Sequence, residues 1–185
     1  PGAQTGGSTA LPPDIHADSR NRLPPARPGA QGVSAIRQHA SGVDVRWLSP
    51  LGRQITELAI LTSAREHDQP YEWSLHEMEA VAVGLDPTVI DIVRHRRPVA
   101  GLADRQAIIV EMGREIFGRH TLGAATYARA LQIFGRADLV DVVSLMGNYA
   151  ATATRLTAFN QQMPPTWKEF LPLPFTPPGD VYPDT

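Results

Sequence analysis

The chain has 185 residues, of which 42% are hydrophobic, and its 17 basic and 19 acidic residues give a formal net charge of -2. This length allows one domain with a substantial core plus some chain outside it. The charge balance excludes a generic nucleic-acid binder, which would present a basic face, and no apolar run approaches the roughly 20 residues of a membrane-spanning helix. The sequence has no cysteine, which excludes disulfides, thiolate metal sites and thiol catalysis.

The N-terminal region, residues 1–32, is rich in proline and glycine and has no sustained apolar period. We therefore expect an extended arm. Its small, polar first residues suit an exported protein after signal-peptide cleavage, and they suit a trimmed chain equally well, so the compartment is left open. We expect a short helix over residues 33–40 and then a loop over residues 42–50 that buries Trp47.

The next stretch predicts two helices joined by a short polar turn. Ser49 followed by Pro50 is typical of a helix start, with Ser49 as the N-cap, and we expect this helix to reach about residue 66. Pro70 opens the second helix, and Gly84 ends it as a C-cap.

The remaining sequence continues the helical pattern and then changes character. Gly135 separates two of the helices that we expect, and the last helix should bury one apolar stripe. The expected helices cover residues 87–94, 102–120, 121–134 and 137–159. The stripe consists of Leu139, Val142, Val143, Met146, Tyr149, Ala150, Ala153 and Leu156. We thus predict an all-α helical domain over residues 33–162, with a proline-rich, non-helical C-terminal tail over residues 163–185.

Three titratable side chains in the two-helix segment form the candidate site. Glu72 and His76 are four residues apart, which places them on one helical face, one turn apart. Glu57 lies on or beside an apolar stripe, where a carboxylate is costly unless it is paired. A histidine between carboxylates can have a pKa near neutrality and can donate a proton to a carbanion or enolate. We therefore expect an acid/base cluster here.

Other interpretations of these residues stay open. The same three side chains could be a polar network that ties two helices together. They could also hold a divalent metal ion, but no second histidine stands at ligand spacing, so we assign no metal ligand. Tyr71, Trp73 and Tyr149 suit either the core or the walls of an apolar crevice, where they would bind substrate. The basic segment 94–97 could attract a carboxylate or form a solvated cluster at a helix end.

Glu57 and the motif YEWSLH at residues 71–76 resemble the carboxymuconolactone decarboxylase family, which has the alkyl hydroperoxidase D-like helical fold. The resemblance covers residues 49–159. It implies an all-α fold of that type, a small-molecule substrate, and a homo-oligomer whose sites lie in helical crevices near subunit contacts. The further segments that carry the resemblance are LPPDIH at residues 11–16, GLDPTVI at residues 84–90, and residues 139–149.

Two branches of this fold imply different chemistry. The thiol-peroxidase branch has a CxxC pair, and Gln69 and Glu72 stand at those two positions here, although His76 and Glu57 match. Thiolate chemistry therefore does not carry over. The decarboxylase branch has a Glu-Leu-x-x-His pattern, which Glu72 and His76 preserve with Trp73 in place of the leucine.

The resemblance therefore implies a lyase or isomerase that uses no cofactor and acts on a small carboxylated or lactone-like molecule. His76 would be the general acid/base, Glu72 would orient and polarise it, and Glu57 would tune its charge. One rival is a non-catalytic, oligomeric small-molecule-binding protein of the same fold, which the two arms favour. Another rival is a peroxidase of the alkyl hydroperoxidase D type, for which we expect no hydroperoxide consumption without a cysteine.

Overall fold

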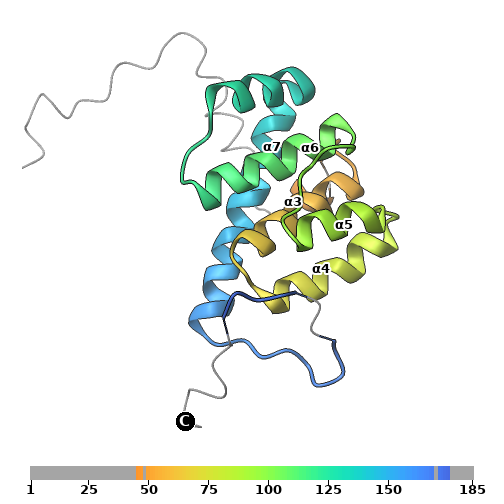
Figure 1. Ribbon diagram of the computed structural model, residues 1–185, viewed down its shortest axis with the longest axis vertical. Helices are drawn as coiled ribbons and strands as arrows, with labels where there is room; N and C mark the ends of the chain where they lie inside the picture. The colour runs from red at the N-terminus through yellow and green to blue at the C-terminus, as the bar shows by residue number, and fades with distance from the viewer. Residues whose placement is uncertain (1–44, 48, 169–170, 176–185) are drawn as a thin grey trace, which may run out of the picture. The chain divides into compact units, whose positions relative to one another are not determined.

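The computed structural model describes residues 45–47, 49–168 and 171–175, and within these ranges the chain is helical and has no strand. The predicted all-α class is therefore confirmed for this part of the chain. The arm expected at residues 1–32 and the helix expected at residues 33–40 lie outside the described residues. The helices are α3 (Arg53–Glu66), α4 (Pro70–Ala82), α5 (Pro87–Arg94), α6 (Asp104–Gly113), the π-helical turn η3 (Arg114–Gly118) and α7 (Ala124–Ala158) (Figure 1).

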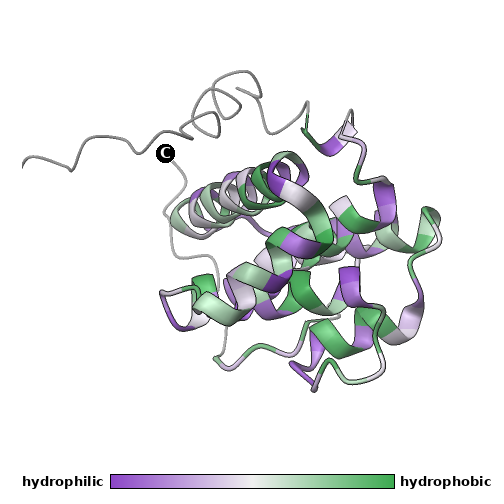
Figure 2. Ribbon diagram, turned by 90° about the horizontal axis from the view of Figure 1, so that it is seen from above, coloured by the Kyte–Doolittle hydropathy of each residue, from purple (hydrophilic) through white to green (hydrophobic). Residues whose placement is uncertain are grey.

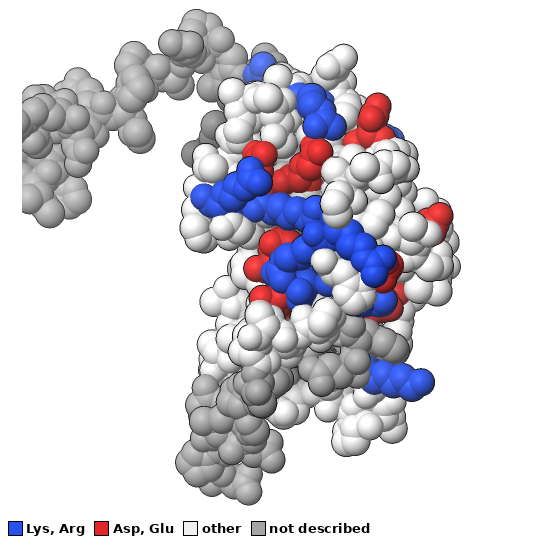
Figure 3. Space-filling model, in the orientation of Figure 1, with Lys and Arg blue, Asp and Glu red and all other residues white. Residues whose placement is uncertain are grey.

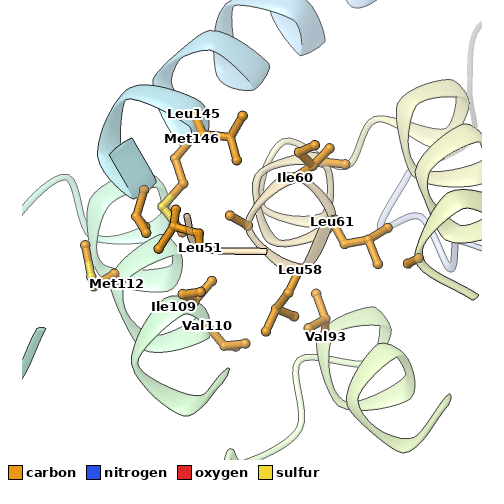
Figure 4. Packing of buried hydrophobic residues seen from close by; sticks show 14 of the residues in the cluster. Leu51, Leu58, Ile60, Leu61, Val93, Ile109, Val110, Met112, Leu145 and Met146 are labelled. Carbon is orange, nitrogen blue, oxygen red and sulfur yellow. The ribbon is translucent and has the colours of Figure 1, made fainter. Parts of the chain in front are cut away.

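Helix α3 is the centre around which the other helices pack. Every residue from 56 to 65 is buried, and the helix contacts α4, α5, α6, η3 and α7. Figure 4 shows Leu58, Ile60 and Leu61 leaving α3 in different directions, toward side chains of the surrounding helices. A helix that is buried on all sides must place even its polar residues inside, which is how Glu57 comes to be enclosed.

A tight turn reverses the chain between α3 and α4. The amide of Asp68 donates to the carbonyl of Arg65, and the amide of Gln69 donates to that of Ala64, with Asp68 in the left-handed region at φ 49°. Gln69 then caps α4, because its side chain accepts a hydrogen bond from the amide of Tyr71. The predicted helix start at Pro70 is confirmed. This turn brings α3 and α4 into contact with each other.

The expected start of α3 is wrong. The helix begins at Arg53, after Gly52 at φ 82°, and no side chain caps it. The Ser49 hydroxyl instead donates to Oδ2 of Asp141 on α7, at 2.7 Å. Ser49 therefore joins two distant segments of the chain and does not cap a helix.

The expected loop that buries Trp47 is also wrong. Residues 45–47 are helical, Trp47 is 54% exposed, and Val45 is the residue of this segment that enters the core. The guanidinium carbons of Arg53 and Arg46 lie 3.9 Å and 4.8 Å from the centre of the indole ring. Trp47 therefore packs on two arginines at the surface, and Val45 is buried in the core.

Helix α7 changes direction at Gly135, whose φ of 69° and ψ of 178° are not helical (Figure 1). The predicted separation of two helices at this glycine is confirmed, although α7 begins at Ala124 rather than at residue 121. Along the second half, Val143 of the expected stripe is 42% exposed, and Leu145 is fully buried in its place.

Charged side chains of both signs are interleaved on the surface. On the face shown in Figure 3, arginines lie beside acidic groups. The basic segment 94–97 is paired: Arg94 with Glu77, Arg97 with Asp91, and Arg96 with both Glu66 and Asp68. Figure 2 shows hydrophilic and hydrophobic residues alternating along the helices. Among the described residues, no helix has the length and apolar character that crossing a bilayer requires.

Candidate active site

Glu57 and His76 contact each other across the hairpin of α3 and α4. Oε2 of Glu57 lies 2.8 Å from Nδ1 of His76, and the two residues are 0% and 3% exposed. An ionised carboxylate can only accept, so Nδ1 donates and Nε2 keeps its lone pair. This is the tautomer that a histidine general base requires.

Two arginines hold the other oxygen of Glu57. Oε1 accepts from Nη2 of Arg53 at 2.7 Å and from Nε of Arg46 at 3.0 Å, and Nη2 of Arg46 forms an ion pair with the same oxygen at 2.9 Å. The buried charge of Glu57 is therefore paired, as burial requires. Neither arginine was among the sequence candidates. Arg53 could have been found, because it stands four residues before Glu57 on one helix, whereas Arg46 carries no local signal.

The proton affinities of this pair follow from burial and charge. Burial alone would raise the pKa of Glu57, but its hydrogen bond and charge interaction with His76, together with Arg46, outweigh burial and hold that pKa below its usual value. Burial lowers the pKa of His76, and the hydrogen bond and charge of Glu57 offset this only in part. Because the arginines hold the carboxylate even when the ring is neutral, we assign an ionised Glu57 beside a neutral His76 at neutral pH.

Glu72 does not take the role expected for it. Its side chain is buried, and neither carboxyl oxygen has a hydrogen-bond partner among the described residues. Burial raises the pKa of Glu72 to about 8, although the charge of Arg155 acts in the opposite direction. At neutral pH this carboxyl therefore keeps its proton for most of the time. Glu57, and not Glu72, is the residue that orients His76.

The three expected substrate-binding aromatics lie in three different settings. The ring of Tyr149, on α7, meets the ring of His76 edge to face, with centroids 4.9 Å apart, and burial raises the pKa of Tyr149. Trp73 is fully buried in the core, and its Nε1 donates to Glu77 at 2.6 Å. Tyr71 packs on Trp167 of the C-terminal segment at 5.4 Å. Of the three, only Tyr149 packs on the ring of His76.

A cavity of about 600 Å³ lies at the N-terminal end of α4. Its walls come from the turn between α3 and α4, the end of α7, and the C-terminal segment. None of Glu57, Glu72 and His76 lines it. The side chains of the acid/base cluster are instead buried within the described chain. The walls of this cavity come mostly from residues that the sequence did not single out. Trp167 and Phe175, which stand among prolines in the tail, were the available signal.

Chemically, the cluster combines a base and an acid. Nε2 of His76 can take up a proton, Glu57 can stabilise the resulting charge, and the protonated Glu72 can give a proton up. Within the described residues, no group of three or more histidine, aspartate or glutamate side chains is placed to hold a metal ion.

Comparisons with family models, with curated proteins and with solved structures find no match to this chain.

Proposed function

We propose that the chain is a cofactor-free lyase or isomerase of the carboxymuconolactone decarboxylase type, which transfers protons on a small carboxylated or lactone-like substrate. The observation that carries this proposal is the 2.8 Å contact between buried Glu57 and His76. On the same helix as His76, Glu72 has a pKa raised to about 8. Environments that push the pKa values of nearby titratable groups apart are typical of acid/base catalysts.

Each group then has one role. In a decarboxylation, the bond between the substrate carbon and its carboxylate breaks, CO2 leaves, and the electron pair enters the conjugated carbonyl as an enolate. A proton from the carboxyl of Glu72 then reaches the carbon. In an isomerisation, Nε2 of His76 takes a proton from one carbon, and the acid returns a proton to another. Glu57 stabilises the imidazolium that forms in the isomerisation, and no electron is exchanged with a redox partner in either reaction.

The resemblance also supports an alkyl hydroperoxidase D-like fold and a homo-oligomer. The outer face of α4 carries Leu75, Met78 and Val81, which are 36%, 48% and 55% exposed. A second copy that covers this face would shield apolar surface from water and would bring a subunit contact close to the helix that carries His76. Light scattering should then show an oligomer for the wild type and a smaller species for Met78→Lys. A monomeric wild type would contradict this part of the proposal.

A non-catalytic small-molecule-binding protein is the second candidate. The observation that favours it is the separation between the cavity and the acid/base cluster. In that case Glu57 and His76 would be a polar network between α3 and α4. The third candidate, a thiol peroxidase, lacks its nucleophile because the sequence has no cysteine.

Deuterium uptake followed by NMR tests the proton-transfer proposal even when the product is unidentified. The protein is incubated in D2O with a panel of γ-lactone carboxylates and the matching lactones, and the signals next to the carbonyl are followed. We expect uptake with the wild type and a rate lower by on the order of 10² or more with His76→Gln. His95→Gln, which changes a 40% exposed side chain at the C-terminal end of α5, should keep the wild-type rate. Equal rates for His76→Gln and the wild type, or no uptake above buffer with any compound, would contradict the proposal.

A further inference from the structure

We propose that the cavity at the N-terminal end of α4 is a binding site for an uncharged, planar aromatic molecule. Its volume of about 600 Å³ lies within the range of small-molecule sites. The inference does not depend on the proton-transfer proposal, because the acid/base cluster does not line this cavity. The residues that line it are His67, Asp68, Gln69, Pro70, Leu156, Thr157, Asn160, Gln161, Gln162, Met163, Pro164, Pro165, Trp167, Leu173 and Phe175.

Aromatic side chains in the C-terminal segment form one wall. Tyr71 packs on the ring of Trp167 at 5.4 Å with an interplanar angle of 31°, and the amide of Trp167 donates to the carbonyl of Pro164 at 2.9 Å. Phe175 also lines the cavity and is 52% exposed. A flat aromatic ligand would cover this exposed ring surface, and contacts between aromatic rings favour such packing.

Contacts with the helices fix this wall in place. Nη1 of Arg65 donates to the carbonyl of Pro172 at 3.0 Å, and Leu171 is 3% exposed. Upstream, the hydroxyl of Ser74 on α4 donates to Sδ of Met163 at 3.4 Å. The wall is therefore attached to α3 and α4 on both sides of Trp167, so the cavity exists before any ligand enters.

The polar groups of the cavity are mainly neutral. Amide side chains, which both donate and accept, come from Gln161 and Gln162, whereas that of Gln69 is engaged with Tyr71 and Thr157. The ring of His67 lies with Nδ1 at 2.8 Å from the carbonyl of Ser63, to which it donates. These groups suit a ligand edge that carries an amide or a similar pair of donor and acceptor.

Charge argues against an anionic ligand. Among the described residues, no arginine or lysine lines the cavity, and its one acidic residue is Asp68. Oδ1 of Asp68 is held by Arg65 at 2.6 Å and by Arg96 at 3.1 Å, so these two cations are already engaged. A carboxylate in the cavity would lose hydration without gaining a cationic partner.

A matched pair of probes tests the proposal by isothermal titration calorimetry on the full chain at neutral pH: 2-naphthamide, which is neutral, and 2-naphthoate, which has the same shape and a negative charge. We expect 2-naphthamide to bind with a stoichiometry of one, and 2-naphthoate to bind about tenfold more weakly or worse. Trp167→Ala should weaken 2-naphthamide binding about fivefold or more. Trp47→Ala, which removes an indole from a site that does not line the cavity, should leave that binding unchanged.

A third variant should reverse the preference for 2-naphthamide over 2-naphthoate, and it leaves the aromatic wall intact. Gln162→Arg adds a cation at an exposed lining position, and it should bind 2-naphthoate at least as tightly as 2-naphthamide. The proposal is overturned if the wild type binds neither probe, if it binds 2-naphthoate as tightly as 2-naphthamide, or if Gln162→Arg keeps the preference of the wild type.

Discussion

Replacing Glu72 by Gln should remove a pH dependence that this buried carboxyl imposes on folding. Burial raises the pKa of Glu72 from its ordinary value of 4.5 to about 8. Between these values the folded chain keeps a proton that the unfolded chain releases, so the free energy of unfolding falls as pH rises, by about 1.4 kcal/mol per pH unit. The stability associated with the protonated Glu72 is fully present below the unfolded pKa, and it is lost as the pH rises through the folded pKa. From about pH 5.5 to about pH 7.5, the wild type should lose about 2–3 kcal/mol relative to Glu72→Gln.

Urea unfolding followed by far-UV circular dichroism at several pH values measures this difference. The difference between the two proteins isolates Glu72 from the other titrating groups, which are common to both. If the wild type and Glu72→Gln lose stability equally as the pH rises, Glu72 is ionised in the folded chain and the reasoning fails.

Three further substitutions test the packing by urea unfolding. Gly113→Ala would place a Cβ at 2.3 Å from Cγ2 of Thr62 and should cost about 1–3 kcal/mol; adding Thr62→Ser, which removes that methyl group and keeps the hydroxyl, should restore most of the loss. Gly147→Ala, in α7, meets nothing within 4 Å and should stabilise by about 1 kcal/mol; a loss there would contradict the open surroundings. Leu58→Ala removes a fully buried side chain of α3 and should cost about 2–5 kcal/mol; a cost below about 1 kcal/mol would place Leu58 outside the core.

Much of the helical pattern could be predicted because its signals act over a few residues. Pro70 at a first helical position, Gly84 after a helix end, and Gly135 at the break in α7 each act through their own backbone preference. The start of α3 was misplaced for the opposite reason. Ser49 is engaged by Asp141, 92 residues away, and no local pattern reveals such a contact.

The sequence predicted which residues form the candidate site, but not which of them contact each other. A spacing of four residues shows that Glu72 and His76 share a helical face, but it does not show which group reaches the ring. Glu57 and His76 meet because the turn at Asp68 brings α3 and α4 together, and this pairing is not set by equal spacing from the turn. The cavity could not be predicted at all, because its walls come from two stretches, residues 67–70 and 156–175, that are far apart in the sequence.

The protonation state of His76 is the most direct test of the acid/base account. In protein with 15N-labelled histidine, long-range 1H–15N NMR spectra show which ring nitrogen carries the proton, and His76→Gln identifies the signals. At about pH 7 we expect a neutral ring with its proton on Nδ1 and a free lone pair on Nε2, because burial lowers the pKa of His76 below its ordinary value. A ring that is charged at about pH 7, or one that carries its proton on Nε2 alone, would contradict the account, because His76 would then have no nitrogen able to take a proton from a substrate.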